Sequence, residues 1–231
     1  FYIENYNWGG FEPMWQSNVV GCVQGSVYPD EYLILGAHYD SIISPLYGNP
    51  LQTAPGADDN ASGVASALEV AKALSENSYY PKKSIIFALF GAEEIGLKGS
   101  TYLAEKYRRN DYNVQLMLNN DMIANRQNND KRLVKLHPYA NSMYLTDIAS
   151  EIILEHTSLT PIVSTTNNPA SDSYPFWQQG YPSIFFHEHD FSPHYHSPAD
   201  IFENCDPGYA CEITKASLLN LLYFDNIPTN V

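Results

Sequence analysis

Short, continuous apolar runs alternate with segments of helical periodicity along most of the chain. The runs are rich in β-branched and aromatic residues and predict strands over residues 18–24, 32–36, 84–90, 114–119 and 183–186. The periodic segments predict helices over residues 61–75, 100–109 and 142–156 and a last helix after Pro207. This alternation is typical of α/β folds. We therefore expect a central, mostly parallel mixed sheet flanked by helices.

Two details of this prediction concern packing. The first two strands are expected to be neighbours around a turn at Pro29 and Asp30. In the helix over 61–75, the apolar residues that recur on one face are expected to point inward. These residues are Val64, Leu68, Ala71 and Leu74.

A chain of 231 residues, 44% of them hydrophobic, is long enough to bury one continuous core. Repeats and low-complexity tracts do not stand out, so we expect residues 1–231 to form a single domain. The longest compact apolar run, residues 85–90, is far shorter than the about 20 residues that span a bilayer. Membrane insertion is therefore not expected.

The chain carries a formal net charge of −14. Binding to a phosphate backbone needs a basic surface, so we expect no nucleic-acid partner. The first residues, 1–4, include no initiator Met and lack the basic start and apolar core of a signal peptide. We expect a processed form of a secreted or periplasmic protein.

The chain has three cysteines, and their spacing fits neither a disulfide-dense scaffold nor a zinc finger. Cys205 and Cys211 could pair with each other and leave Cys22 alone. Three free thiols are an equally good interpretation.

Histidine and acidic residues follow four of the predicted strands. His38 and Asp40 follow the strand over 32–36, Glu93 and Glu94 follow the next, and Asp121 follows the strand over 114–119. The last strand leads into a histidine-rich segment over residues 187–196. Binding groups of an open α/β sheet gather at the carboxyl ends of its strands, so these residues predict a site at that edge.

The residue types at this edge favour a pair of metal ions. Imidazole nitrogens and carboxylate oxygens suit zinc, and the absence of a cysteine cluster argues against a closed structural site. Two divalent ions about 3.5–4 Å apart need a bridging carboxylate and further ligands. An acid beside the attacking water must stay unligated to act as general base.

Five segments resemble, in the same order, those of the M28 zinc aminopeptidases. They are residues 36–41 (GAHYDS), 55–63 (PGADDNASG), 91–100 (GAEEIGLKGS), 120–122 (NDM) and 195–200 (YHSPAD). One segment alone is a weak signal, whereas five in order are a strong one. The resemblance extends from about residue 18 to the C-terminus and implies the zinc exopeptidase fold, which is phosphorylase/hydrolase-like.

The resemblance also assigns metal ligands. His38 and Asp121 would bind one zinc ion, and Glu94 and His196 the other. Asp59 would bridge the two ions. The cofactors implied are therefore two zinc ions per chain.

The same resemblance implies two further residue roles and one feature of the backbone. Glu93 would be the general base, and Asp40 would be the acid that orients His38. The peptide bond between Asp59 and Asn60 would be cis. Three other histidines near His196 are expected to stay outside the ligand set, namely His187, His189 and His194.

The oxyanion donor differs between branches of the family. One branch has a tyrosine shortly before a Ser-Asp-His segment, where this chain has Asn168 followed by Ser-Asp-Ser over residues 171–173. Another branch uses the tyrosine directly before the last histidine ligand, and Tyr195 stands at that position. Tyr195 is therefore the expected donor.

The function implied is a zinc-dependent exopeptidase that removes N-terminal amino acids from peptide substrates by attack of metal-activated water. One alternative is a carboxypeptidase or dipeptidase of the same fold, which needs a cationic group for the substrate carboxylate. Among Lys and Arg residues only Lys98 lies in a family segment, which favours the aminopeptidase. Two further candidates of the same fold are a single-zinc, glutaminyl cyclase-like transferase and a receptor-like domain without metals.

Overall fold

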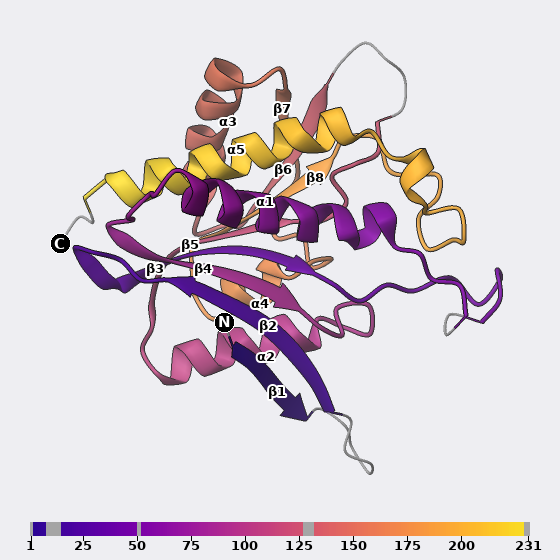
Figure 1. The fold of residues 1–231 in the computed structure, drawn as a ribbon, viewed down its shortest axis with the longest axis horizontal. Helices are drawn as coiled ribbons and strands as arrows, with labels where there is room; N and C mark the ends of the chain where they lie inside the picture. The colour runs from indigo at the N-terminus through magenta and orange to yellow at the C-terminus, as the bar shows by residue number, and fades with distance from the viewer. Residues whose placement is uncertain (1, 8–14, 50–51, 127–131, 229–231) are drawn as a thin grey trace.

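The computed structural model describes residues 2–7, 15–49, 52–126 and 132–228. They form one eight-stranded mixed sheet in the order β1-β2-β4-β3-β5-β8-β6-β7, flanked by helices (Figure 1). The strands are β1 (Tyr2–Asn7), β2 (Trp15–Val23), β3 (Tyr28–His38), β4 (Lys83–Phe90), β5 (Asn113–Asn120), β6 (Leu133–Pro138), β7 (Thr160–Val163) and β8 (Ser183–Glu188). The helices are η1 (Ala57–Ser62), α1 (Gly63–Glu76), α2 (Lys98–Arg109), α3 (Met143–His156), α4 (Ser173–Gln178), η2 (Phe202–Asn204) and α5 (Pro207–Asn226). The expected α/β class is confirmed.

The four central strands β4, β3, β5 and β8 run parallel to one another. β1, β2 and β6 join the sheet through antiparallel pairs, and β7 lies parallel to β6 at the far edge. Strands buried on both faces read as continuous apolar runs, which is why β4 and β8 are buried along almost their whole length. Their carboxyl ends therefore meet at one edge of the sheet.

Two apolar cores hold the helices on the sheet. The first core lies between the sheet and helices α1, α3 and α5, and includes Leu33 and Leu35 of β3. The second lies on the opposite face beneath α2 and α4 and includes Ile34 between those two leucines. This alternation is the two-residue period of a strand, and Figure 1 shows the two helical layers on either side of the sheet.

The turn predicted at Pro29 and Asp30 is wrong, because both residues lie inside β3. β2 and β3 are also not neighbours, since β4 lies between them and pairs with both. α1 is the crossover helix between β3 and β4, which makes these two strands parallel neighbours. β4 therefore lies beside β3 where β2 was expected.

The predicted inward face of α1 is wrong in part. Leu74 is buried, but Leu68 is 53% exposed. The helix instead packs through Ser66, Ala67 and Val70, all of them buried. α1 lies against both the sheet and α5 (Figure 1).

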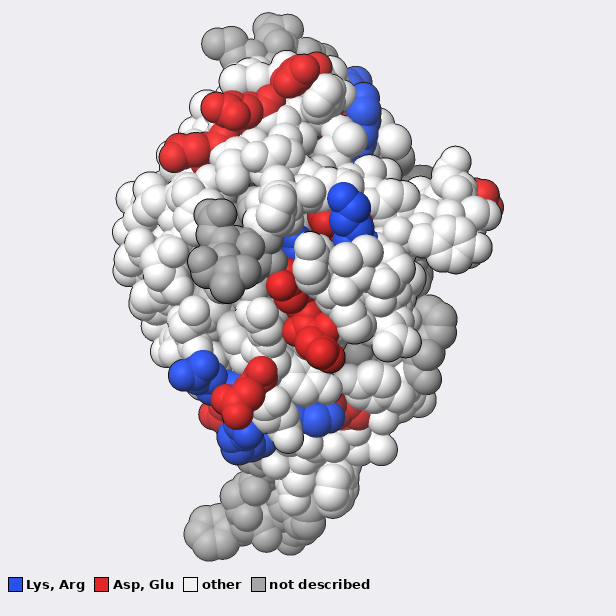
Figure 2. Space-filling model, turned by 90° about the vertical axis from the view of Figure 1, so that its left-hand side faces the viewer, with Lys and Arg blue, Asp and Glu red and all other residues white. Residues whose placement is uncertain are grey.

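The surface and the cysteines bear on the remaining expectations. Figure 2 shows the end of the molecule where α5 terminates, and on its described part acidic and basic side chains form small mixed groups rather than one continuous basic patch. Within the described ranges no helix combines the length and apolar character needed to cross a membrane. Cys22, Cys205 and Cys211 are all free thiols, which decides between the two interpretations of their pairing.

Candidate metal centre

The predicted ligands lie close together, near the carboxyl ends of the parallel strands. His38 is the last residue of β3, Asp121 directly follows β5, and Glu94 lies in the turn after β4. Asp59 lies in η1, which leads into α1, and His196 lies in the segment after β8. The structure therefore brings all five predicted ligands together.

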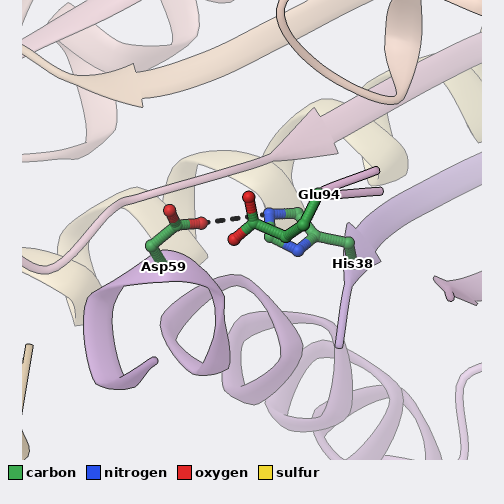
Figure 3. Close-up of side chains that lie close together, drawn as sticks. All are labelled: His38, Asp59 and Glu94. Atoms are coloured by element: carbon green, nitrogen blue, oxygen red, sulfur yellow. Dashed lines mark ion pairs between the residues drawn. The ribbon is translucent and has the colours of Figure 1, made fainter. Parts of the chain in front are cut away.

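Asp59 lies between the two imidazoles. Its Oδ1 is 3.2 Å from Nε2 of His38, and its Oδ2 is 3.2 Å from Nε2 of His196. Figure 3 shows the first of these contacts, with Glu94 beside it. One carboxylate thus presents one oxygen to each histidine, which is the arrangement that a bridging ligand requires.

Each imidazole has a second carboxylate of its own. Nε2 of His38 is 3.3 Å from Oδ1 of Asp121, and Nε2 of His196 is 2.8 Å from Oε2 of Glu94. The side chains thus divide into two half-sites that share Asp59. Glu94 also lies close enough to His38 and Asp59 to share an ion with them, so the assignment of each ligand to one ion stays a prediction.

These separations fit zinc. Two ligand atoms of one tetrahedral zinc ion, each about 2.0–2.1 Å from the metal, lie about 3.3 Å apart. Nε2 of His196 and Oε1 of Glu94 are buried and have no hydrogen-bond partner within the described part of the chain. Nε2 of His196 lies within 3.2 Å of carboxylate oxygens of Asp59 and Glu94. Ligand atoms that share one metal ion lie at such distances from one another. His38, Asp59 and Asp121 would hold one ion, and Asp59, Glu94 and His196 the other.

The electrostatics of the centre also favour the binding of cations. Burial raises the pKa of Glu93 to about 10; the positive charge on His38 opposes this shift, and the negative charges of Asp172 and Asp121 add to it. Burial likewise raises the pKa of Asp172, which lies fully buried behind the site, to about 7. Carboxylates crowded in this way ionise readily only beside positive charge, which divalent ions supply.

We expect about two zinc ions per chain when the protein is purified without chelator and reloaded with zinc. Elemental analysis with a protein assay measures this ratio. Asp59→Asn should bring the ratio below two, because the bridge loses its charge. Glu69→Gln, which changes an acid with a 64% exposed side chain on α1, should keep it. A single tight site in the unaltered protein would contradict the two-ion centre.

Asp40 makes a different contact from the one expected. Nδ1 of His38 lies 3.0 Å from the backbone carbonyl oxygen of Asp40 and 3.8 Å from its carboxylate. The carboxylate instead accepts hydrogen bonds from the backbone N–H groups of Glu93, at 3.0 Å, and Glu94, at 3.2 Å. Asp40 therefore orients His38 through its main chain and fixes the two glutamates through its side chain.

Two supporting residues were missed by the sequence analysis. The Asp200 carboxylate accepts hydrogen bonds from the backbone N–H groups of Asp58 and Asp59, at 2.9 and 3.1 Å. The Ser171 hydroxyl donates to Oδ2 of Asp121 at 2.6 Å. Asp200 belongs to the same family segment as His196, and that was the available signal. The Asp59–Asn60 peptide bond is cis, as expected.

A cavity of about 220 Å³ opens onto the centre. Glu93 and four of the ligands line it, and its outer wall contains Lys135, His137, Asn168, Phe185, His187, Phe191 and Tyr195. A larger cavity of about 790 Å³ lies between α1 and α5, but its lining is mostly apolar and contains none of the ligands. The chemistry therefore belongs to the smaller cavity.

Tyr195 and Asn168, the two positions considered for an oxyanion donor, both lie on this wall. The Tyr195 ring stacks on His196 with 3.7 Å between ring centroids. Nδ2 of Asn168 lies 3.1 Å from Nδ1 of His137, and its Oδ1 accepts a hydrogen bond from the backbone of Ala170. The Asn168 amide is thus engaged on both sides.

The histidines expected outside the ligand set have other contacts. Nδ1 of His187 lies 2.6 Å from the carbonyl oxygen of Glu188, and His187 lines the cavity. Nδ1 of His189 lies 3.0 Å from the Asp190 carboxylate. The oxygen partners of these two rings come from their own segment of the chain.

Comparison with known proteins gives consistent results. The sequence model of peptidase family M28 matches residues 18–220. A probable zinc metalloprotease of Pyrenophora tritici-repentis is 41% identical over 117 residues, which cover 49% of this chain and 26% of the relative. A probable aminopeptidase of Saccharomyces cerevisiae is 29% identical over 210 residues, covering 88% of this chain and 56% of the relative. The chain therefore spans about a quarter to about half of the length of these relatives.

The fold has solved counterparts. The crystal structure of LapB from Legionella pneumophila superposes with a TM-score of 0.81 at 22% sequence identity, covering 97% of this chain and 60% of LapB. At this level of identity the likeness concerns the fold, which it confirms.

Proposed function

Because the chain belongs to peptidase family M28, we propose that it is a zinc-dependent exopeptidase that removes amino acids from the free N-termini of peptides. The family assigns the chain to the zinc peptidases, which are hydrolases. Release of residues from the N-terminus, rather than from the C-terminus, is what we propose beyond the family assignment. The observation that carries the mechanism is the position of Asp59 between His38 and His196, with Glu93 beside His38 and Asp121 in the same cavity.

The chain's own residues divide the chemistry among them. Bound zinc would polarise the scissile carbonyl and make a water molecule nucleophilic. Glu93 takes a proton from that water and passes it to the leaving amine. Asp40 holds the backbone of Glu93 in place, and the Tyr195 hydroxyl donates to the oxyanion that develops at the carbonyl oxygen.

The negative charge of the cavity favours binding of the α-amine of a peptide substrate. The cavity is rich in carboxylates, and the chain as a whole carries a net charge of −14. A cationic α-amine is attracted to such surroundings more readily than a free carboxylate. A single-zinc cyclase needs no bridging carboxylate, whereas Asp59 lies between two imidazoles here.

One observation favours the dipeptidase alternative. Lys135 lines the cavity, although it belongs to none of the family segments. It supplies the cationic group that a substrate carboxylate needs, whereas the family segments contain only Lys98.

We expect release of single residues from a peptide with a free N-terminus and an amidated C-terminus. A matched peptide that is N-acetylated and has a free C-terminus should stay intact, because it lacks the amine that the acidic site attracts. Mass spectrometry of the products with time measures both. Cleavage of the acetylated peptide from its C-terminal end would overturn the aminopeptidase proposal and leave the two-metal mechanism standing.

Peptides are the partners proposed, and a nucleic-acid partner is not. The secreted or periplasmic localisation stays a prediction, which fractionation of the source cells can test.

A further inference from the structure

Lys135 lies on the side of β6 that faces the cavity. Its neighbours in the strand, Val134 and Leu136, are buried in the core beneath α3 and α5. Because side chains alternate along a strand, Lys135 and His137 point to the other side, where both line the cavity of the metal centre. Lys135 is partly buried there.

Within the described ranges, no carboxylate forms an ion pair with the ammonium group of Lys135. Other partly buried cations have such a partner: Lys106 pairs with Glu4, and Arg126 pairs with Asp206. Among the described residues Lys135 forms no ion pair and is the only Lys or Arg that lines the cavity. Lys135 thus lines the same cavity as the acidic ligands without forming an ion pair with any of them.

The imidazoles around Lys135 do not carry compensating charge. The pKa of His137 is lowered to about 4, mainly by burial, and the positive charge of Lys135 acts in the same direction. Burial also lowers the pKa of His187. Both rings are therefore neutral near pH 7, and the positive charge on this part of the wall belongs to Lys135.

The sheet register fixes how far Lys135 lies from the metal centre. Asn120 of β5 pairs with Phe186 of β8, so the ligand Asp121 lies level with His187. His187 in turn pairs with Lys135 of β6. The three residues form one row across the sheet, and two strand spacings separate the ends of the row by about 10 Å. The Lys135 side chain can span part of this distance, and the part of a substrate next to its scissile carbonyl can span the rest.

We propose that Lys135 binds a substrate carboxylate that lies within one residue of the scissile carbonyl. This specificity rests on the proposed exopeptidase function and narrows its substrates to peptides with an acidic group at that distance. Such a carboxylate has two sources: the side chain of an N-terminal glutamate or aspartate, or the free C-terminus of a dipeptide. In both cases a charge-assisted hydrogen bond forms inside a partly desolvated pocket, where it is stronger than in water.

The test uses zinc-loaded protein and two pairs of substrates, each of which differs only in the carboxylate. The first pair is the p-nitroanilides of glutamate and glutamine, which report on the side chain. The second pair is the dipeptide Leu-Gly and its C-terminal amide, which report on the C-terminus. Lys135→Met removes the charge and keeps the length of the side chain, and Lys135→Arg keeps the charge. Lys72→Met, at a 56% exposed side chain on α1, is the matched control.

We expect kcat/KM of the unaltered protein to favour the carboxylate member of one pair by about tenfold or more, the scale of one added ionic hydrogen bond. The pair that shows the preference identifies the source of the carboxylate. Lys135→Met should abolish the preference and change kcat/KM for the neutral member by less than about twofold. Lys135→Arg should restore most of the preference, and Lys72→Met should leave it intact.

Two results would overturn the role of Lys135. One is an unaltered protein without preference in either pair, and the other is an equal loss on charged and neutral substrates in Lys135→Met. If none of these free-amine substrates is cleaved, the aminopeptidase proposal fails, and calorimetry then decides the role of Lys135 separately. Tighter binding of glutamate than of glutamine, lost in Lys135→Met, supports it, whereas equal binding of the two amino acids overturns it.

Discussion

Replacement of Glu93 by glutamine is expected to remove nearly all turnover while both zinc ions stay bound. Glutamine has the shape of glutamate, and its backbone N–H would keep the hydrogen bond to Asp40. It cannot accept a proton from the attacking water. The expected loss in kcat is on the order of 10²–10⁴-fold, the range for a removed general base. Steady-state kinetics and elemental analysis of the same preparation measure the two properties.

Glu94→Gln is the matched comparison for Glu93→Gln. The two residues are adjacent, and both backbone N–H groups bond to Asp40. Glu94, however, lies 2.8 Å from Nε2 of His196, so its replacement should weaken one metal site. If both variants lose zinc to the same extent, the division into base and ligand is wrong.

The cluster of candidate metal ligands could be predicted from the sequence, because each residue in it is tied to a recognisable local pattern. His38 and Asp121 stand at the ends of strands that are buried on both faces, and such strands are the easiest to recognise. The parallel sheet then brings the strand ends together without further information. Asp59 and His196 came instead from the family segments, since neither directly follows a strand.

The parts that were missed depend on contacts between distant segments. Lys135 belongs to β6, a short strand next to the sheet edge that was not predicted, and only the register with β8 places it beside the cavity. The contact of Asp40 with Glu93 and Glu94 joins residues more than fifty positions apart. Short strands and contacts of this kind leave little periodicity in the sequence.

The error in α1 has a related cause. Apolar residues recur on more than one side of that helix, and the periodicity favoured the side with Leu68. The packing of α1 on the sheet and α5 buries the small residues Ser66 and Ala67 instead, and the Ser66 hydroxyl accepts a hydrogen bond from Asn120 of β5. The side of α1 that faces α5 depends on the tertiary structure. It could therefore not be predicted from the sequence of α1 alone.

Tyr195→Phe is expected to lower kcat by on the order of 10²-fold or more, with a much smaller change in KM. Tyr195 lines the cavity with Glu93 and stacks on His196, so its hydroxyl belongs to the wall on which the carbonyl oxygen of a substrate would lie. Asn168 is a poor substitute, because its amide is engaged by His137 and Ala170. Phenylalanine keeps the stacked ring and removes only the hydroxyl.

Tyr39→Phe is the matched control for this prediction. Tyr39 also stands next to a ligand, His38, but its hydroxyl donates to the backbone carbonyl of Ser17 at 2.7 Å. Its replacement should therefore leave kcat close to normal, and elemental analysis should find the zinc content of both variants unchanged. A near-normal kcat in Tyr195→Phe, or an equal loss in Tyr39→Phe, would exclude Tyr195 as the oxyanion donor. Stabilisation of the oxyanion would then fall to Asn168 or to the metal ions alone.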